Sequence, residues 1–266
     1  MLERTEHDNG VVTFQSPRLR EAGVTHAFST RLGGVSKGPY ASLNLATLEK
    51  SEQSDANTAV AENFRRLRRA LGCERAVRVE VKQVHGTAVW SPPADPVKPS
   101  DAPQADALVT DRPNQLLTVR VADCVPVLLA ERTGRVVAAV HAGWRGVVAG
   151  VVPETLKAMH ARFDVPAEAV VAAIGPHIGV TPFEVGPEVA EAFEAAALAE
   201  TIDRTIDVKP HVDLGRAVRC QLQRGGVPAA AIDDGAGCTY QQDDLFFSYR
   251  RDGTRSGRMA AVIGRA

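Results

Sequence analysis

The sequence predicts a mixed α/β (α+β) fold, in which a single domain has a mixed β-sheet core flanked by helices. Its 266 residues are 44% hydrophobic and 24% charged, which is ordinary for a globular chain that buries one large core. Short apolar runs typical of strands are mixed with longer helical patterns, without a regular βαβ order. Because no internal repeat or clean linker divides the chain, we expect one domain over residues 1–266.

The first part of the chain carries two strand patterns around one helix. Residues 24–29 indicate an early strand, which runs into a glycine-rich turn at residues 31–36. A helix is expected from a cap at Ser54 or Asp55 to about Leu71, just before a glycine stop signal. Residues 77–81 alternate apolar and polar side chains and therefore predict a half-buried strand.

The middle of the chain carries three short apolar runs. Residues 116–122, 125–130 and 136–140 are partly β-branched and separated by turn residues, so we expect buried strands. They follow residues 91–105, whose five prolines indicate a surface loop. A helical pattern covers residues 146–163, although a glycine and a proline weaken its first turns.

The last part of the chain mixes the two patterns. Residues 170–174 and 259–263 predict strands. Residues 187–200 form an alanine-rich helical pattern that begins with a proline, a residue suited to a first turn. Asp213 is expected to cap a further helix that runs to about Gln223.

Charge and composition argue against several classes of function. The net charge is −1 and aromatic residues make up 5%, so neither a basic field nor a base-stacking surface predicts nucleic-acid binding. No stretch approaches the ~20 apolar residues of a membrane span, and residues 1–9 lack the apolar core of a secretory signal. We therefore expect no membrane partner. Because the cysteines are also widely spaced and no export signal is evident, we expect reduced thiols and a cytoplasmic protein. The sequence leaves the oligomeric state open.

Three short motifs each place one metal ligand at the end of a predicted strand. Two imidazoles and one thiolate form a set that Zn²⁺ accepts, with a fourth position open for water or substrate. The same set also suits a thiol nucleophile with histidine bases. The motifs are Gln83-Val84-His85-Gly86, Ala122-Asp123-Cys124-Val125-Pro126 and His141-Ala142-Gly143-Trp144-Arg145-Gly146.

Taken singly, these residues also have ordinary structural interpretations. Cys124 suits a buried core, and His85 suits a strand end. Arg145 suits either a bidentate contact with phosphate or carboxylate, or an ion pair that holds a turn. Asp123 is a candidate acceptor for a histidine N–H, or alternatively a cap of its own turn. Together, the wide spacing of His85, Cys124 and His141 favours a site assembled from distant strands over a compact structural zinc site.

These motifs resemble those of the YfiH (DUF152) family, also called the laccase-domain or multicopper polyphenol oxidase family. The similarity runs from about Val24 to Gly264, so residues 1–20 are interpreted as a variable N-terminal segment. Further segments that carry it are Arg31-Leu32-Gly33-Gly34-Val35-Ser36, Ser42-Leu43-Asn44-Leu45, Ala105-Asp106-Ala107-Leu108-Val109-Thr110, Gly175-Pro176, Phe183-Glu184-Val185-Gly186 and Phe247-Ser248-Tyr249-Arg250-Arg251.

The resemblance implies a mixed α/β fold shared with a bacterial toxin deamidase of Cys–His type, and a zinc site at His85, Cys124 and His141. It also implies phosphorolysis of purine nucleosides: adenosine, inosine, guanosine or 5′-methylthioadenosine reacts with phosphate to give a base and ribose 1-phosphate. Adenosine deamination is associated with the family as well. The expected partners are therefore a small-molecule nucleoside and phosphate.

For this reaction we expect His85, Cys124, His141 and Arg145 to be catalytic. Candidate phosphate-binding residues are Arg31, Arg145 and Arg250, because arginine clamps position and stabilise such anions. Asn44 is a candidate contact for the sugar or the base. Asp123 and Glu184 are candidate proton shuttles.

Two other activities stay open from the sequence. Some relatives resemble peptidoglycan editing factors, and a Cys–His amidase with Cys124 as nucleophile and His141 as base would suit that chemistry. A copper-dependent polyphenol oxidase is the second alternative. Copper is less favoured than zinc, because the 7 histidines are too few to support a trinuclear cluster in addition to one His₂Cys site.

Overall fold

The computed structural model describes residues 1–46, 55–95 and 101–265. Its strands are β1 (Glu3–Glu6), β2 (Val12–Gln15), β3 (Val24–Ser29), β4 (Val77–Val79), β5 (Val89–Trp90), β6 (Ala107–Thr110), β7 (Gln115–Val121), β8 (Val125–Glu131), β9 (Val137–Ala142), β10 (Val170–Ile174), β11 (Ile202–Asp203), β12 (His211–Val212), β13 (Ile232–Asp233) and β14 (Met259–Arg265).

The α-helices are α1 (Pro17–Glu21), α2 (Asn57–Ala70), α3 (Trp144–Ala149), α4 (Val151–Phe163), α5 (Pro187–Ala195), α6 (Leu214–Arg224) and α7 (Tyr249–Asp252). Short 3₁₀ helices cover Gly38–Tyr40, Ala167–Ala169, Ala199–Thr201, Ala229–Ala231 and Gly253–Arg255. None of the helices within the described ranges is both long enough and apolar enough to cross a membrane.

Within the described residues, the strands form two six-stranded sheets and a small two-stranded ribbon of β11 and β12. The first sheet has the order β1-β2-β3-β14-β7-β4, and the second has the order β13-β10-β8-β9-β6-β5. Most neighbours are antiparallel, but the pairs β4–β7, β5–β6 and β10–β13 are parallel. The predicted mixed α/β fold is therefore confirmed, although it has two sheets at its centre where we expected one.

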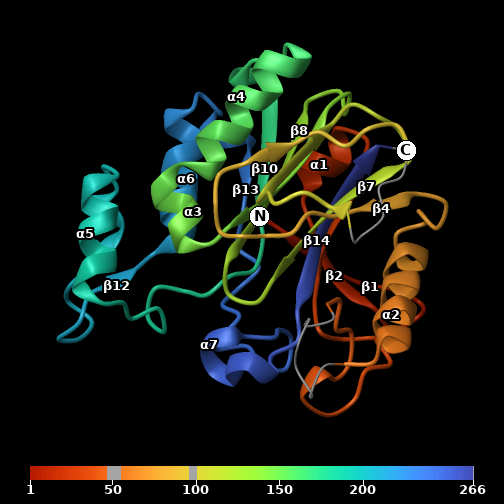
Figure 1. The fold of residues 1–266 in the computed structure, drawn as a ribbon, viewed down its shortest axis with the longest axis horizontal. Coiled ribbons are helices and arrows are strands. Elements are labelled where there is room, and N and C mark those ends of the chain that lie inside the picture. Colours follow the sequence, from red (N-terminus) through yellow and green to blue (C-terminus); the bar gives the residue numbers. More distant parts are fainter. Residues whose placement is uncertain (47–54, 96–100, 266) are drawn as a thin grey trace.

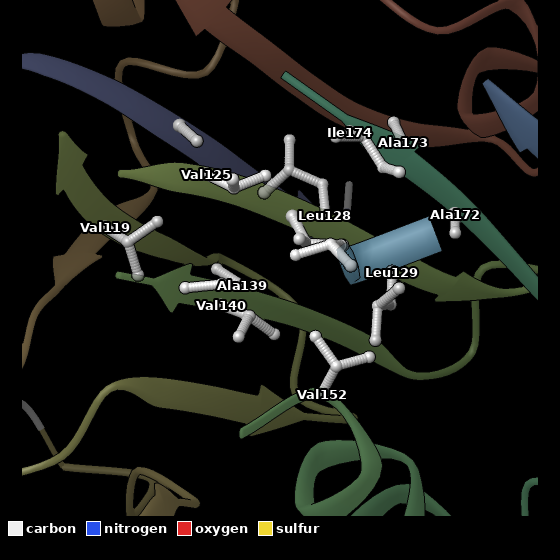
Figure 2. Packing of buried hydrophobic residues seen from close by; sticks show 14 of the residues in the cluster. Val119, Val125, Leu128, Leu129, Ala139, Val140, Val152, Ala172, Ala173 and Ile174 are labelled. Atoms are coloured by element: carbon white, nitrogen blue, oxygen red, sulfur yellow. The ribbon is translucent and has the colours of Figure 1, made fainter. Parts of the chain in front are cut away.

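Successive side chains along a strand point to opposite faces of its sheet, and this alternation explains how the sheets are layered. On β14, Met259, Ala261 and Ile263 belong to the core in which β14 and β7 pack against β8 and β9. The intervening Ala260 and Val262 pack instead with the apolar face of α2. The helices α3, α4 and α6 pack on the second sheet, as Figure 1 shows. Burial on both faces gives β8, β9 and β10 their nearly continuous apolar sequences (Figure 2).

Local signals decide several boundaries. The expected helix over residues 146–163 is two helices, because Gly150 adopts φ +88° between α3 and α4. Helix α2 begins at Asn57 after an Ala56 cap, so the Asp55 cap is wrong, and Ser54 lies outside the described residues. The Asp213 cap of α6 is confirmed, because its carboxylate accepts a hydrogen bond from the Arg216 N–H.

Candidate metal centre

The candidate metal centre lies where the chain crosses between the two sheets. His85 follows β4 of the first sheet and precedes β5 of the second. Cys124 lies in the turn between β7 of the first sheet and β8 of the second. His141 is near the end of β9, whose Ala142 pairs with Val125, the residue after Cys124. Residues far apart in sequence are therefore brought together where the two sheets meet.

The ligand atoms of these residues converge. One ligand atom from each of His85, Cys124 and His141 lies within 4.8 Å of the others. The Cys124 Sγ and the His85 Nε2 are 3.9 Å apart, and the two imidazole rings meet edge to face. Tetrahedral zinc with bonds of about 2.0–2.3 Å holds its ligand atoms roughly 3.5 Å apart. The donor types and spacing therefore fit a metal ion with one position left for another ligand.

Asp106 organises both histidines. Its carboxylate accepts a hydrogen bond from His141 Nδ1 at 2.8 Å, which directs the Nε2 lone pair toward the cluster. It also accepts the backbone N–H groups of Val84, His85 and Gly86 at 3.2, 2.9 and 2.7 Å. The side chain is completely buried. One carboxylate thus orients one imidazole and shapes the turn that presents the other.

The electrostatics of the cluster favour an ionised thiol. Burial raises the pKa of the Cys124 thiol, but the charge and hydrogen bond of His141 and the contact with His85 outweigh it and lower that pKa to about 6. Burial lowers the pKa of His141, but the Cys124 thiolate and the Asp106 carboxylate raise it to about 9. The metal-free protein therefore favours a thiolate beside an imidazolium, which is also the ion pair of a thiol nucleophile.

The backbone around the cluster permits close approach. His85 and Asp123 both adopt positive φ, at 61° and 94°, which turns the chain sharply at each crossing. Gly143 precedes α3 and faces the ligands. A Cβ on Gly143 would lie 2.6 Å from His85 Cδ2 and 3.1 Å from Cys124 Sγ. The glycine is therefore required by the space that the ligands occupy.

Among the residues that the structure describes, no histidine donates a hydrogen bond to the Asp123 carboxylate, so its expected role as acceptor for a histidine N–H is wrong. Its carboxylate instead accepts the Thr239 hydroxyl at 2.7 Å and the Arg250 backbone N–H at 2.6 Å. These bonds tie the Cys124 turn to the start of α7. Asp106 takes the position expected for Asp123. Glu184, the other candidate proton shuttle, forms an ion pair with Lys209.

The predicted arginine and asparagine contacts have different surroundings. Arg145 is exposed at the second residue of α3, and its guanidinium lies 4.3 Å from the centre of the Trp144 ring. Arg31 and Arg250 donate to backbone carbonyls, at Ala41 and Asp243 for Arg31 and at Pro182 and Glu184 for Arg250. Their contact with a substrate stays a prediction.

Asn44 is completely buried. Its amide donates to the Ala46 carbonyl and the Asp55 carboxylate, and its oxygen accepts the backbone N–H groups of Ala46 and Arg258. These bonds hold the loop that follows β3. The structure thus shows Asn44 in a structural role. Its contact with a sugar or base stays a prediction.

Sequence reasoning missed Asp106 as the partner of His141. A carboxylate that opens the apolar run Ala107–Thr110 was the available signal, because such a group must find hydrogen-bond donors when it is buried. Reasoning of this kind identifies the need for a partner. It does not identify which backbone turn or imidazole supplies it.

The fold and this cluster define a mixed α/β protein with a candidate Cys–His metal site between two sheets. The site combines an ionisable thiol, two imidazoles and a buried carboxylate. The chain belongs to the family described as multi-copper polyphenol oxidoreductase laccase, whose model matches residues 25–266.

Individual relatives support this assignment. The chain is 40% identical over 258 residues to a protein of Deinococcus radiodurans named purine nucleoside phosphorylase, covering 96% of this chain and 93% of that protein. It is 41% identical over 247 residues to the Escherichia coli protein named purine nucleoside phosphorylase YfiH, with coverage of 91% and 93%. The crystal structure of YlmD from Geobacillus stearothermophilus superposes with a TM-score of 0.85 at 32% identity, covering 98% of each chain. The resemblance to the YfiH family is confirmed.

Proposed function

We propose that this chain is a zinc-dependent purine nucleoside phosphorylase that also deaminates adenosine, and that residues 1–266 act as a single catalytic domain. The observation that carries the proposal is the convergence of His85, Cys124 and His141 within 4.8 Å beside the buried Asp106. The names of the relatives from D. radiodurans and E. coli support the reaction class. The 4 cysteines are all free, which supports a cytoplasmic location.

The chain's own residues would hold the metal and prepare the substrate. His85 Nε2, Cys124 Sγ and His141 Nε2 are the proposed ligand atoms, and Asp106 would keep the His141 imidazole in the required tautomer. When bound, zinc would supply Lewis-acid chemistry that stabilises developing negative charge. Arg145, exposed beside the cluster, would bind an anionic group of the reactants.

The surroundings of the cluster suit a flat, largely apolar base. Val84 and Trp144 adjoin His85 and Gly143 in sequence, and Val84 is 48% exposed. Tyr249, 50% exposed, starts α7 beside the Arg250 N–H that binds Asp123. Aromatic side chains next to polar groups are suited to stacking on a purine ring while its nitrogens are hydrogen-bonded.

Two balanced reactions follow from this assignment. In phosphorolysis, a phosphate oxygen forms a bond to ribose C1′ while the C1′–N9 bond breaks, and its electron pair leaves with the purine, which takes up a proton. The products are the free base and ribose 1-phosphate. In deamination, water adds its oxygen to adenosine C6, one of its protons passes to N6 and the other to N1, and the C6–N6 bond breaks to give ammonia and inosine. Both reactions need charge stabilisation at the purine.

The test combines metal analysis with a nucleoside screen. We expect about one zinc per chain in the wild type and clearly less in Cys124→Ala. Adenosine, inosine, guanosine and 5′-methylthioadenosine are then incubated with and without phosphate. Base release that requires both phosphate and bound zinc supports the proposal. Base release that ignores phosphate would identify a hydrolase instead, and no release from any nucleoside would refute the assignment.

A second candidate is a Cys–His amidase that edits peptidoglycan precursors. The specific observation behind it is the pKa of Cys124, lowered to about 6 beside an imidazole whose pKa is raised to about 9. Bound metal would block that nucleophile. Amidase activity on muropeptides should therefore survive chelation and disappear in Cys124→Ser, whereas zinc-dependent phosphorolysis should disappear on chelation.

Copper-dependent phenol oxidation is the third candidate, and the family description carries that name. Among the residues that the structure describes, His85, Cys124 and His141 are the one group of this kind. A single His₂Cys set suits one copper ion, without the further ligands of a multicopper centre. Phenol oxidation that depends on stoichiometric copper would favour this candidate over the other two.

A further inference from the structure

Arg258 lies at the edge of the candidate metal centre, although it was not among the predicted site residues. It directly precedes Met259, which pairs with Val121 across the β14–β7 ladder. Continuing that register puts Arg258 opposite Ala122, next to Asp123 and Cys124. Its backbone N–H donates to Asn44 Oδ1 at 2.9 Å, which fixes this position.

A second arginine shares the same face of the sheet. Arg120 pairs with Ala260, so Arg258, two residues before Ala260, is its diagonal neighbour. The nearest carboxylate of Arg120 is Glu80, at 4.0 Å, and Glu80 also pairs with Arg78 at 3.4 Å. Within the described residues, no carboxylate forms an ion pair with Arg258. Two arginines are therefore held on one face of the sheet, with Asp123 and Cys124 as negative charges that act on Arg258, and a tetrahedral anion would be stabilised between the two guanidinium groups.

The guanidinium of Arg258 is fixed by its own loop. Nη1 donates to the carbonyls of Ser256 and Gly257 at 2.7 and 2.9 Å. In the part of the chain that the structure describes, Nε and Nη2 carry no hydrogen bond. These two groups form one edge of the planar guanidinium, the edge that binds an oxyanion bidentately. The Tyr249 ring lies 5.6 Å from the guanidinium carbon.

Burial lowers the pKa of Arg258, and Arg120 acts in the same direction, whereas Cys124 and Asp123 raise it. The electrostatic influence of Cys124 agrees with a position beside the metal cluster. The arginine keeps its charge under all ordinary conditions. Arg258 is thus a half-buried, oriented cation with an unused donor edge.

We propose that Arg258, assisted by Arg120, binds a tetrahedral oxyanion next to the metal centre, and that this anion is the phosphate of the reaction. The assignment of this anion as the phosphate of the reaction rests on the proposed function, whereas the anion site itself does not. Arg258 suits the role better than Arg31, whose Nε and Nη1 both donate to backbone carbonyls, at Ala41 and Asp243. Arg145 would then be free to contact another part of the reactants.

Direct binding of inorganic phosphate is the first test. Phosphate is titrated by calorimetry into the zinc-loaded wild type, Arg258→Gln, Arg258→Lys and Arg120→Gln. The matched control is Arg255→Gln, since Arg255 is an exposed arginine of the same loop. A lost bidentate charge-assisted contact weakens binding by about 10- to 100-fold. We expect that loss in Arg258→Gln, a partial loss in Arg258→Lys and Arg120→Gln, and none in Arg255→Gln.

Steady-state kinetics form the second test. In Arg258→Gln, KM for phosphate should rise by a similar factor, while KM for the nucleoside changes little. Adenosine 5′-monophosphate is titrated in parallel, because its phosphate ester offers the same chemistry. If inorganic phosphate competes with this nucleotide for a common site, the result supports a site for the attacking phosphate. If only the nucleotide binds, the site holds a phosphate group of the substrate instead, and the assignment is overturned.

The two proposals can fail separately. If phosphate binding depends on Arg258 but no nucleoside is cleaved, the anion site stands and the phosphorylase assignment fails. If nucleosides are phosphorolysed with an unchanged phosphate KM in Arg258→Gln, the phosphorylase assignment stands and the anion site is refuted. Arg258→Lys preserves the charge, so a folded, zinc-loaded Lys variant keeps the test decisive even where Arg258→Gln unfolds.

Discussion

At the scale of single residues, the Asp106 carboxylate joins the His141 imidazole to the backbone of the turn that presents His85. Replacing it with alanine removes the acceptor for His141 Nδ1 and for the backbone N–H groups of the His85 turn. Loss of such an orienting partner typically weakens metal binding by about 10- to 100-fold. We therefore expect a chromophoric chelator to remove zinc from Asp106→Ala at a chelator concentration lower by the same factor than the wild type requires.

Asp111 offers the matched control, because it is an exposed aspartate in the turn just after β6. Asp111→Ala should keep the wild-type zinc affinity. Asp106→Asn retains one acceptor oxygen and should fall between the two. Equal affinities in Asp106→Ala and wild type would mean that the imidazoles are oriented by something other than this carboxylate.

The thiol of Cys124 makes a pH-dependent prediction for the metal-free protein. Its pKa is lowered to about 6, so the reactive thiolate is already formed at neutral pH and disappears as the pH falls below about 6. Burial raises the pKa of Cys73 to about 11, which leaves that thiol protonated at the same pH. We expect alkylation of Cys124 by iodoacetamide to be half-maximal near pH 6, as followed by peptide mass spectrometry.

Cys73 supplies the internal control in the same sample, because it should react appreciably only at strongly alkaline pH. Zinc should suppress the labelling of Cys124 and leave Cys73 unchanged. A Cys124 midpoint near the ordinary thiol pKa of about 8.5 would argue against a thiolate–imidazolium pair.

At the scale of elements, the start of α3 limits the space around the ligands. Gly143 has an ordinary negative φ of −72°, so alanine there introduces no backbone strain. Its Cβ would nevertheless lie 2.6 Å from His85 Cδ2. We expect Gly143→Ala to fold normally and to displace the imidazole, which would lower zinc occupancy in metal analysis.

Gly86 is a suitable comparison, because a Cβ there would have only ordinary contacts, the nearest at 3.6 Å. Gly86→Ala should retain its zinc and its N–H bond to Asp106. If both variants retained zinc equally, the His85 turn would be more adaptable than its contacts with Gly143 indicate.

The strand-end motifs explain why the convergence of three side chains could be predicted from sequence. His85, Cys124 and His141 each follow or end a recognisable apolar run, and such positions meet at sheet edges. Asp106 was missed as a partner because its donors are the backbone of residues 84–86 and the imidazole of His141, 35 residues away, and no local pattern encodes these contacts. The break at Gly150 was only half visible, since periodicity continues through it.

At the scale of the whole molecule, the expected single mixed sheet was the main error of the fold prediction. Each strand pattern is local, but membership of a sheet depends on pairing between distant strands. Nothing in the apolar run of β7 or β8 indicates that the chain leaves one sheet for the other at Cys124. The convergence of His85, Cys124 and His141 was therefore easier to predict than the architecture that brings them together.

The layered architecture also predicts that stability and metal binding can be separated. Leu67 is completely buried where α2 packs on the outer face of the first sheet, among residues that include none of the proposed ligands. Leu67→Ala should destabilise the fold by about 2–5 kcal/mol and lower Tm accordingly, because it leaves a cavity. Zinc per folded chain should stay unchanged at 25 °C, since the proposed ligands are held at the crossings between the sheets.

The exposed Arg69 of the same helix gives the control: Arg69→Ala should change stability by less than about 0.5 kcal/mol. Thermal unfolding and metal analysis of the same samples decide the matter, because zinc loss in a folded Leu67→Ala protein would mean that the α2 layer and the metal centre are coupled.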